Sequence, residues 1–496
     1  MAATRLSTAV SVAVAVLLGI FLLLVVVKLP WNGDLGVHAA TLQRLSHSPG
    51  DPGNPMVDSD TTSPYYSPWM LLLGLLAEVT GWPVFGVLRI AALIALPLLI
   101  SGIWRFARSL ARPGGVALAG PLAVLCILLL WGTTEFSWSG FVGLSSLSLT
   151  CSYPSTFALG CAFHLWAWLH RQLGSGRGPT WTAALAMGLL WAVTLLNHQF
   201  TGVIATLGVL ALLGGARPWP ARSVWLRLGT GALCGVALLA LWPYYDFFAL
   251  AGVGGLEAIH EPLYHRLTVR FGLVLLGVAA LALRARRDLR DPLVLFFLSG
   301  AAVFAAGGLT GHYSWGRALP AALIPAQLAA ALEAAGAGRR SVARGFALLV
   351  AAALLVGAWA QRGALGYVVP PRLLPGPVAE AYRTPWPGYA WATDRMNWGD
   401  VVMARERPGR QLPAYGPYTV APGYPDFFLP DQRRRLADTA RFYSPATSRQ
   451  EQERILTRWK VRWVLLDRGD PAPPRGLLSL VAEGTDGQRL YSVHAQ

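Results

Sequence analysis

The chain has 496 residues, of which 54% are hydrophobic and 13% are charged, whereas soluble domains usually carry about 25% charged residues. Its net charge is +16, but the basic residues lie between apolar segments, where the positive-inside rule places them, so we expect no nucleic-acid partner. Apolar stretches of spanning length recur between residues 9 and 361, too many for a soluble core, and the sequence therefore predicts a multi-pass integral membrane protein.

The first apolar run covers residues 9–27. It is too long for the hydrophobic part of a signal peptide, and no small-residue cleavage site follows it, so we interpret residues 8–29 as the first spanning helix. The next apolar segment, 69–79, is shorter than the ~20 residues that a span needs, and we expect a helix at the membrane surface. Residues 30–83 are thus predicted to form a large first outer loop with surface helices.

Further apolar segments bring the expected number of spanning helices to about eleven. They lie at 84–106, 116–133, 153–170, 181–197, 200–213, 224–245, 269–283, 292–309, 318–335 and 343–360.

The distribution of arginine predicts the orientation of these helices. With a cytoplasmic N-terminus, most loop arginines fall on the cytoplasmic side, and counting 69–79 as a full span would reverse every later loop. The outer loops then hold few basic residues: Arg44, Arg89, Arg266, Arg270 and Arg317. We therefore expect a plasma-membrane protein, in contact with membrane lipids, whose N-terminus is cytoplasmic and whose C-terminal domain is extracytoplasmic.

The composition changes near Pro370, after which charged residues and proline become frequent. Residues 362–377 are rich in Pro and Gly and are interpreted as a linker. Residues 378–496 alternate between strand-like and helix-like pieces. Strands are expected at 400–404, 418–421, 461–467 and 478–482, and helices at 431–442 and at 448–460, the second with Ser448 as N-cap and Glu451 three residues on.

The predicted fold class is therefore a mainly α-helical, polytopic membrane protein. Residues 1–361 are expected to form the transmembrane domain, and residues 378–496 a small extracytoplasmic α/β domain.

Two polar residues follow the first span and are candidates for chemistry. Asp34 comes almost directly after that helix, and His38 lies four residues later, on the same face of a predicted helix. One interpretation is that the carboxylate of Asp34 caps this helix by accepting backbone N–H bonds. The other is that Asp34 is held at the membrane surface as a general base or metal ligand.

The rest of the first outer loop combines carboxylates, hydroxyls and aromatic side chains. Asp58 and Asp60 are either turn residues or substrate contacts. Tyr65, Tyr66 and Trp69 are typical of the aromatic belt at a membrane interface.

Several features of this loop occur together. They are an Asp after the first span, a His on an amphipathic helix, a Tyr-Tyr-x-Pro entry to a short apolar helix, its Thr-Gly end, and a Val-Leu-Arg-Ile segment: Asp34, His38, 65–68, 80–81 and 87–90. This arrangement resembles the GT-C superfamily of membrane glycosyltransferases, which use polyprenyl-phosphate sugars. Segments 151–155 and 197–202 look like outer-face pieces of that superfamily, and 400–403 with 462–466 resembles tails of uncharacterised actinobacterial members.

The resemblance implies a function and a set of roles. Asp34 would be the catalytic base that takes the proton of an acceptor hydroxyl, which attacks the anomeric carbon with inversion. The donor would be a polyprenyl-phosphate monosaccharide, and the acceptor a cell-envelope glycan, lipid or protein. Superfamily members often carry paired acidic residues after the first span, where this chain has Gly33 and Asp34. Mg²⁺ or Mn²⁺ is a candidate cofactor, with Asp34 and Glu135 as candidate ligands.

A departing lipid phosphate calls for cations near the outer surface. Arg266, Arg270 and Arg317 fall at outer ends of predicted spans. The alternative interpretation of each is a contact with lipid headgroups. Other candidate substrate contacts lie in outer loops, where the alternatives are an exposed carboxylate or a satisfied interfacial histidine: Glu135, His198, His260 and His312. No Gly-rich nucleotide-binding loop follows a strand, as expected for a lipid-linked donor.

The rival class is a non-enzymatic membrane protein, either a transporter or flippase or an envelope-assembly protein. A transporter predicts ionisable residues deep within its spans. Glu333 and Arg344 lie near the ends of predicted spans, and the middles of the spans are nearly uncharged. This pattern favours chemistry at the surface over a conduction path.

Overall fold

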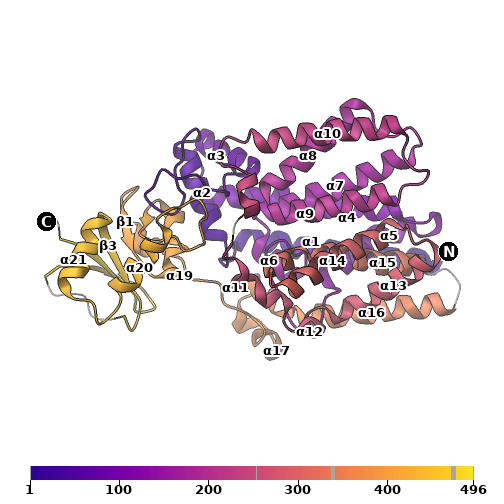
Figure 1. The fold of residues 1–496 in the computed structure, drawn as a ribbon. Helices are drawn as coiled ribbons and strands as arrows, with labels where there is room; N and C mark the ends of the chain where they lie inside the picture. Colours follow the sequence, from indigo (N-terminus) through magenta and orange to yellow (C-terminus); the bar gives the residue numbers. More distant parts are fainter. Residues whose placement is uncertain (1, 253, 337–340, 471–475, 495–496) are drawn as a thin grey trace. The chain divides into compact units, whose positions relative to one another are not determined.

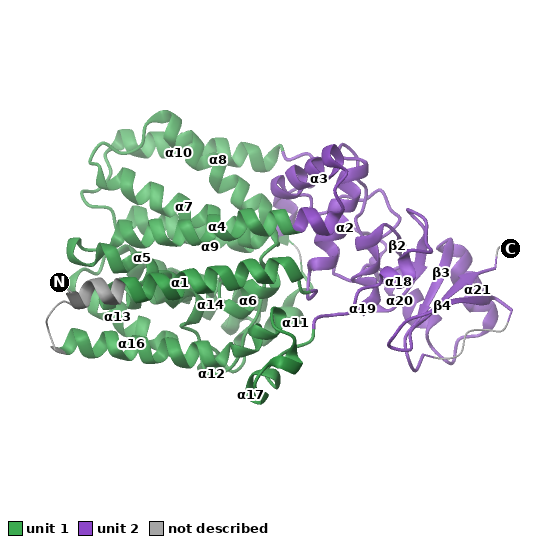
Figure 2. Ribbon diagram, turned by 180° about the vertical axis from the view of Figure 1, so that it is seen from behind, with its two compact units in different colours: residues 1–30, 89–241, 252–384 green, residues 31–88, 242–251, 385–496 purple. Residues whose placement is uncertain are grey.

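The computed structural model describes residues 2–252, 254–336, 341–470 and 476–494. The chain divides into two compact units, each built from several stretches of sequence (Figure 1, Figure 2). Unit 1 comprises Met1–Pro30, Arg89–Leu241 and Gly252–Thr384, and unit 2 comprises Trp31–Leu88, Trp242–Ala251 and Pro385–Gln496. The first outer loop therefore belongs to the same unit as the C-terminal tail.

Unit 1 is made of helices. Its long helices are α1 (Ala2–Lys28), α4 (Val84–Leu110), α5 (Val116–Leu129), α7 (Pro154–Gly174), α8 (Trp181–Asn197), α9 (Gln199–Gly214), α10 (Arg222–Ala240), α13 (Leu275–Arg287), α14 (Pro292–Thr310), α15 (Pro320–Ala335) and α16 (Ser341–Ala360). Of α4, the residues from Arg89 on belong to unit 1. Short helices connect them: η1 (Pro113–Gly115), α6 (Leu144–Thr150), α11 (Glu257–His260), η3 (Glu261–Tyr264), α12 (Leu267–Phe271), η4 (Gly272–Val274), η5 (Tyr313–Ala318), η6 (Arg362–Tyr367), η7 (Pro371–Leu373) and α17 (Gly376–Ala379).

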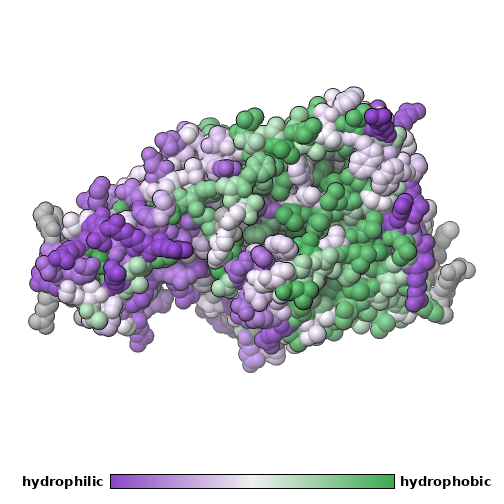
Figure 3. Space-filling view, in the orientation of Figure 1, coloured by the Kyte–Doolittle hydropathy of each residue, from purple (hydrophilic) through white to green (hydrophobic). Residues whose placement is uncertain are grey.

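Helix α15 forms the centre of unit 1. The most apolar stretch of this helix is 94% buried, whereas the corresponding stretches of α10 and α16 are only 22% buried. Apolar side chains gather on the outside of the long helices, as Figure 3 shows, and include the exposed Leu233 and Leu355. An apolar exterior around an apolar interior is what a bilayer solvent requires, so the chain is a multi-pass membrane protein.

Small residues allow the outer helices to approach closely. A Cβ added at Gly188 of α8 would lie 1.8 Å from the carbonyl oxygen of Gly231 of α10. Such small-residue contacts are typical of helix packing in membranes, where backbone proximity replaces the hydrophobic driving force between helices.

Every span expected from the sequence coincides with a helix. Seven helices among the described residues are long and apolar enough to cross a membrane: Ala9–Lys28, Val84–Leu110, Arg222–Ala240, Leu267–Arg287, Pro292–Thr310, Tyr313–Ala335 and Val342–Ala360. The other four expected spans correspond to α7 and to the shorter apolar helices Pro113–Leu129, Trp181–Asn197 and Gln199–Gly214. The total of about eleven therefore stays a prediction.

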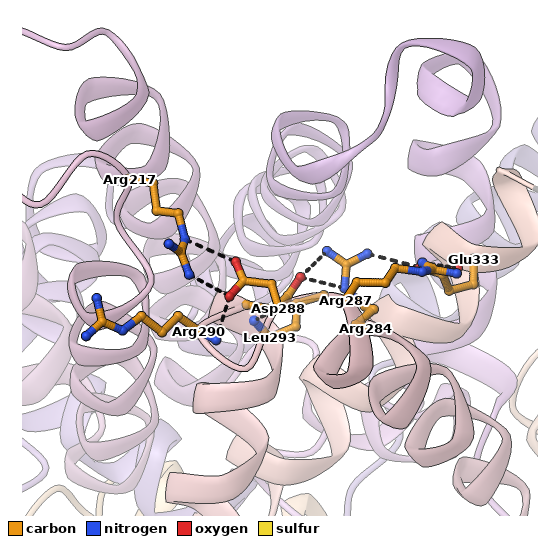
Figure 4. A network of polar contacts seen from close by, with 8 residues as sticks. Arg217, Arg284, Arg287, Asp288, Arg290, Leu293 and Glu333 are labelled. Carbon is orange, nitrogen blue, oxygen red and sulfur yellow. Dashed lines mark hydrogen bonds and ion pairs between the residues drawn. The ribbon is translucent and has the colours of Figure 1, made fainter.

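Charged side chains at the ends of three long helices form a network (Figure 4). Arg284 of α13 lies 2.7 Å from Asp291 and 3.4 Å from Glu333, and Arg287 lies 2.9 Å from the same Glu333. Arg217 pairs with Asp288 at 2.7 Å. These ion pairs join the ends of α13, α14 and α15, so Glu333 serves as a structural counter-ion.

Unit 2 combines two helices of the first outer loop with a small sheet. Its elements are α2 (Leu35–His47), α3 (Pro68–Thr80), η2 (Phe248–Gly252), α18 (Ala390–Thr393), β1 (Val401–Met403), α19 (Glu406–Gly409), η8 (Leu412–Tyr415), β2 (Tyr418–Thr419), α20 (Gln432–Phe442), α21 (Arg449–Arg458), β3 (Val461–Leu466), β4 (Leu478–Glu483) and β5 (Arg489–Val493). Helix α3 has 13 residues and covers the segment expected as a surface helix. Its N-cap is Ser67, and its C-cap is Gly81, whose φ of +66° is the left-handed conformation that favours glycine.

The sheet has the strand order β2-β1-β3-β5-β4. Strand β1 runs parallel to β2 and β3, and β5 runs antiparallel to β3 and β4. Alternate residues of β3 face two cores, because Val464 packs with Met403 and Ile455 while Leu465 packs with Val402. The four expected strands are present, and β5 was not expected.

The expected N-cap of the last helix is confirmed, since the Ser448 hydroxyl accepts the backbone N–H of Glu451 at 3.3 Å. The expected linker, 362–377, contains η6, η7 and the first half of α17, and these belong to unit 1.

Candidate functional site

The polar centre of unit 1 is a contact between His198 and Arg317. His198 connects α8 to α9 and is the N-cap of α9, where its Nδ1 lies 2.7 Å from the Thr201 hydroxyl and 3.2 Å from the Thr201 backbone nitrogen. Its Nε2 lies 3.1 Å from Nη2 of Arg317 in η5. Arg317 is 7% exposed, so its charge lies in an environment of low dielectric.

The protons of this pair determine what it can bind. A guanidinium can only donate, so Nε2 of His198 accepts from Arg317, and the neutral ring carries its proton on Nδ1, which donates to the Thr201 hydroxyl. This bond orients the buried guanidinium of Arg317. An anionic oxygen is the partner that such a cation suits.

Aromatic rings surround this pair. The guanidinium of Arg317 lies 4.7 Å from the ring centroid of Phe200. The ring of His260 lies 5.5 Å from that of Phe200 and 6.2 Å from that of Trp138. Gly140 borders the group, because a Cβ there would lie 3.2 Å from Cε1 of His198. Aromatic faces next to polar donors are the surfaces that sugar rings pack against.

His260 is a neutral member of this group. It is buried, and its Nδ1 donates to the carbonyl oxygen of Leu256 at 2.9 Å, which leaves Nε2 as an acceptor. Burial, assisted by the charge of Arg317, lowers the pKa of His260 from 6.5 to about 4. The ring therefore offers an acceptor to a substrate hydroxyl at neutral pH.

A carboxylate holds the segment that carries Arg317. Glu257 accepts the backbone N–H of Ser314 at 2.8 Å and the Ser314 hydroxyl at 3.1 Å, which ties α11 to η5. The acidic residue of this loop thus orients the cation.

The remaining cations and His312 make other contacts within unit 1. Arg270 donates to the carbonyl oxygen of Pro262 at 2.6 Å. Arg266 is exposed and adopts a φ of +56° before α12. His312 is exposed and stacks on Trp315 with ring centroids 5.3 Å apart. The structure thus brings together His198, His260 and Arg317 of the residues predicted in unit 1.

Glu135 forms an ion pair with Arg383, whose Nε lies 3.4 Å from its carboxylate. Across the described ranges, no three His, Cys, Asp or Glu side chains gather in a way that could hold a metal ion. Asp34 belongs to unit 2 and Glu135 to unit 1, so the Mg²⁺ or Mn²⁺ centre that the resemblance suggested stays a prediction, and we derive no step through a metal.

Asp34 and His38 lie in unit 2, at the start of α2. Asp34 is half-buried and occupies the N-cap position with φ −84° and ψ 7°, and its backbone oxygen accepts the N–H of His38 at 3.2 Å. Within the described α2 and its flanks, the Asp34 side chain makes no capping hydrogen bond, so capping does not explain the carboxylate.

His38 is buried, and its ring lies edge-on to Tyr65 with centroids 5.8 Å apart. Desolvation lowers the pKa of His38 from 6.5 to about 3, so this ring is neutral at physiological pH.

Asp58 and Asp60 are exposed residues of the loop between α2 and α3. The loop folds around the buried Asn54, whose side chain accepts the N–H groups of Met56 and Val57. The carboxylates of Asp58 and Asp60 thus point to solvent.

Three members of this site were not predicted from the sequence: Phe200, Trp138 and Gly140. Phe200 lies two residues after His198 in a segment already singled out, which is the one signal that pointed to it. Trp138 and Gly140 follow an apolar segment without a recognisable motif. The resemblance gives Asp34 and Arg317 roles in one reaction; Asp34 belongs to unit 2 and Arg317 to unit 1, so a site that they share stays a prediction.

The chain has the fold of the GT-C membrane glycosyltransferases, which confirms the resemblance at the level of fold. It is similar over 99% of its length to the arabinofuranosyltransferase AftD from Mycobacteria, with 16% identity and a TM-score of 0.58, and it covers 40% of that chain.

It is also similar to ArnT from Cupriavidus metallidurans in the apo state, with 15% identity, a TM-score of 0.55, and coverage of 99% of this chain and 98% of that chain. ArnT bound to undecaprenyl phosphate gives 15% identity, a TM-score of 0.55 and coverage of 98% and 97%. The chain thus spans well under half the length of AftD and nearly all of ArnT. No protein-family model matches the chain, and no curated protein matches it.

Proposed function

We propose that this protein is a membrane glycosyltransferase. It transfers a monosaccharide from a polyprenyl-phosphate donor to a cell-envelope glycan, lipid or protein at the outer face of the membrane. The observation that carries this proposal is the buried guanidinium of Arg317, which donates to Nε2 of His198 within an aromatic surround. The GT-C fold and the similarity to ArnT, of which one structure is bound to undecaprenyl phosphate, support it.

The donor side of the reaction is assigned to unit 1. Oxygens of the lipid phosphate accept from Arg317, which His198 orients, and these bonds strengthen as negative charge develops on the leaving group. Burial of Arg317 increases this effect, because little water screens its charge. Phe200 and Trp138 provide apolar faces for the sugar, and Nε2 of His260 accepts from one of its hydroxyls.

The acceptor side is assigned to Asp34. Its carboxylate takes the proton of the acceptor hydroxyl while the hydroxyl oxygen bonds to the anomeric carbon. The bond between that carbon and the phosphate oxygen breaks, and its electron pair leaves with the lipid phosphate. Because attack and departure occur on opposite faces, the sugar inverts. His38 is neutral and serves as a hydrogen-bonding neighbour of this site.

The charge distribution argues against a transporter. Glu333, which lies within an apolar helix, is paired with Arg284 and Arg287 and is therefore no candidate for a proton relay.

The test is sugar transfer by the purified full-length chain in lipid nanodiscs. A panel of radiolabelled polyprenyl-phosphate sugars is incubated with wild type, Asp34→Asn and, as a matched control, Asp58→Asn, which changes an exposed carboxylate of the same loop. Loss of a general base lowers the rate by about 10²- to 10⁴-fold, and we expect this for Asp34→Asn alone. Equal transfer by all three forms would refute the role of Asp34, and no transfer by wild type with any sugar would favour the non-enzymatic class.

A further inference from the structure

We propose that the C-terminal tail positions the carboxylate of Asp34, through Tyr424 and Arg410. This inference rests on the proposed function. The glycines on either side of the carboxylate, Gly33 and Gly36, contact these two tail residues, and all of them belong to unit 2. We call residues 33–36 the Asp34 turn.

The first contact is a hydrogen bond to the residue before Asp34. The hydroxyl of Tyr424 donates to the carbonyl oxygen of Gly33 at 2.6 Å. Gly33 has a φ of +50°, and its N–H donates to the side chain of Asn32 at 2.7 Å. Both polar groups of the Gly33 backbone therefore have fixed partners, which restricts the direction in which the chain enters α2.

The second contact is steric and lies two residues after Asp34. A Cβ at Gly36 would lie 1.7 Å from the carbonyl oxygen of Arg410. Arg410 donates from Nε to the carbonyl oxygen of Gly423 at 2.8 Å, and Gly423 precedes Tyr424 in the chain. The two contacts with the Asp34 turn thus come from one hydrogen-bonded piece of the tail.

The far end of α2 is also attached to the tail. Arg44 is 2% exposed and donates from Nη2 to the carbonyl oxygens of Gly416 at 2.9 Å and Pro417 at 3.0 Å. Its guanidinium lies 3.6 Å from the ring centroid of Tyr418 and 4.4 Å from that of Trp398. A helix attached at both ends cannot rotate about its axis without breaking one set of contacts.

This arrangement has a consequence for catalysis. A general base is effective only when its oxygen stays within hydrogen-bonding reach of the acceptor proton. The tail therefore acts on the reaction through the orientation of α2, and Tyr424 and Arg410 are positioning residues.

Two pairs of variants separate positioning from general stability. Tyr424→Phe removes the bond to Gly33, and Tyr443→Phe removes a comparable buried hydroxyl that lies 2.7 Å from the carbonyl oxygen of Leu465 in the core of the tail. Gly36→Ala places a methyl group against Arg410, and Gly50→Ala, in the same unit, meets nothing within 4 Å.

We expect Tyr424→Phe to lower kcat about tenfold with KM for the lipid-linked donor changed less than twofold, and Gly36→Ala to lower kcat further. Tyr443→Phe and Gly50→Ala should keep kcat. In the Asp34→Asn background, Tyr424→Phe should cause no further loss, because its effect runs through that carboxylate. Equal kcat in the two tyrosine variants, or an undiminished effect without Asp34, would overturn the inference.

Hydrogen–deuterium exchange gives a readout that does not depend on activity. Amides at the start of α2 should exchange faster in Tyr424→Phe than in Tyr443→Phe, and equal exchange would overturn the positioning role. If wild type transferred no sugar, the proposed function would fail, and the exchange data would still decide whether Tyr424 orients the Asp34 turn.

Discussion

Nε2 of His198 lies 3.1 Å from Nη2 of Arg317, although the two residues are 119 positions apart in the chain. The imidazole is held by its other nitrogen, which donates to the hydroxyl of Thr201 at the start of α9. The guanidinium donates to this ring and lies on the segment that Glu257 ties down through Ser314. A buried cation is thus oriented by two separate elements.

The first prediction concerns the charge of Arg317. Arg317→Gln should lower kcat/KM for sugar transfer about 100-fold, because a buried donor to the departing phosphate is lost. Arg317→Lys keeps the charge but not the planar fork and should recover part of the loss. The matched control is Arg266→Gln, at an exposed position, which should keep at least half of the activity. Equal losses in Arg317→Gln and Arg266→Gln would show that no specific cation binds the phosphate.

The second prediction separates the two roles of His198. Asn is a good N-cap residue but has no acceptor at the position of Nε2 to orient Arg317, so His198→Asn should keep the thermal stability of the protein and lose about 100-fold in kcat. His198→Ala removes both functions and should also lower the free energy of unfolding by about 1 kcal/mol.

Thermal unfolding in detergent and transfer assays measure these two effects. Full activity of His198→Asn would mean that the ring acts only as a cap.

The third prediction concerns pH and His260. Its pKa is lowered from 6.5 to about 4 in the folded protein, so between these values the unfolded chain binds more protons than the folded one. Stability from this group is therefore complete above about pH 6.5 and is lost as the pH falls toward about 4. His260→Gln should reduce the dependence of Tm on pH across this window.

The comparison for this prediction is His312→Gln, at an exposed histidine. Tm is measured for both variants and wild type at intervals from pH 4.5 to 7.5. An unchanged slope in His260→Gln would argue that other groups, such as the buried His38, dominate the acid sensitivity.

The fourth prediction concerns orientation in the membrane. A cysteine at Thr485, in the exposed turn between β4 and β5, should react with a membrane-impermeant maleimide in intact cells. A cysteine at Ser175, in the exposed turn between α7 and α8, should react only after the cells are permeabilised. Both are introduced after Cys234, the exposed native cysteine, is replaced by Ser. The reverse pattern of labelling would place the tail in the cytoplasm and rule out an outer active site.

The sequence predicted the helices of unit 1 well because a membrane makes hydrophobicity a nearly one-dimensional signal. A spanning helix needs ~20 apolar residues in a row, and such runs are visible without knowledge of any partner. The same reasoning separated the short helix α3, with 13 residues, from the longer ones. Local chemistry also carried information, as the Ser448 cap shows, because that bond joins residues three positions apart.

The strand β5 shows the limit of this approach. Its five residues have no strong apolar run, and it becomes a strand through pairing on both sides with β3 and β4. The role of Asp34 was likewise open, since a carboxylate before a helix suits both capping and catalysis. The structure decided that it does not cap α2.

By itself the sequence determined that this chain is a polytopic membrane protein with a small α/β tail and a polar first loop, because these properties follow from composition along short windows. Tertiary structure alone decided that His198 meets Arg317, and that Tyr424 meets Gly33 from 391 positions away. The physical reason is that such contacts depend on how helices pack and where the chain returns, and no local pattern of residues records either.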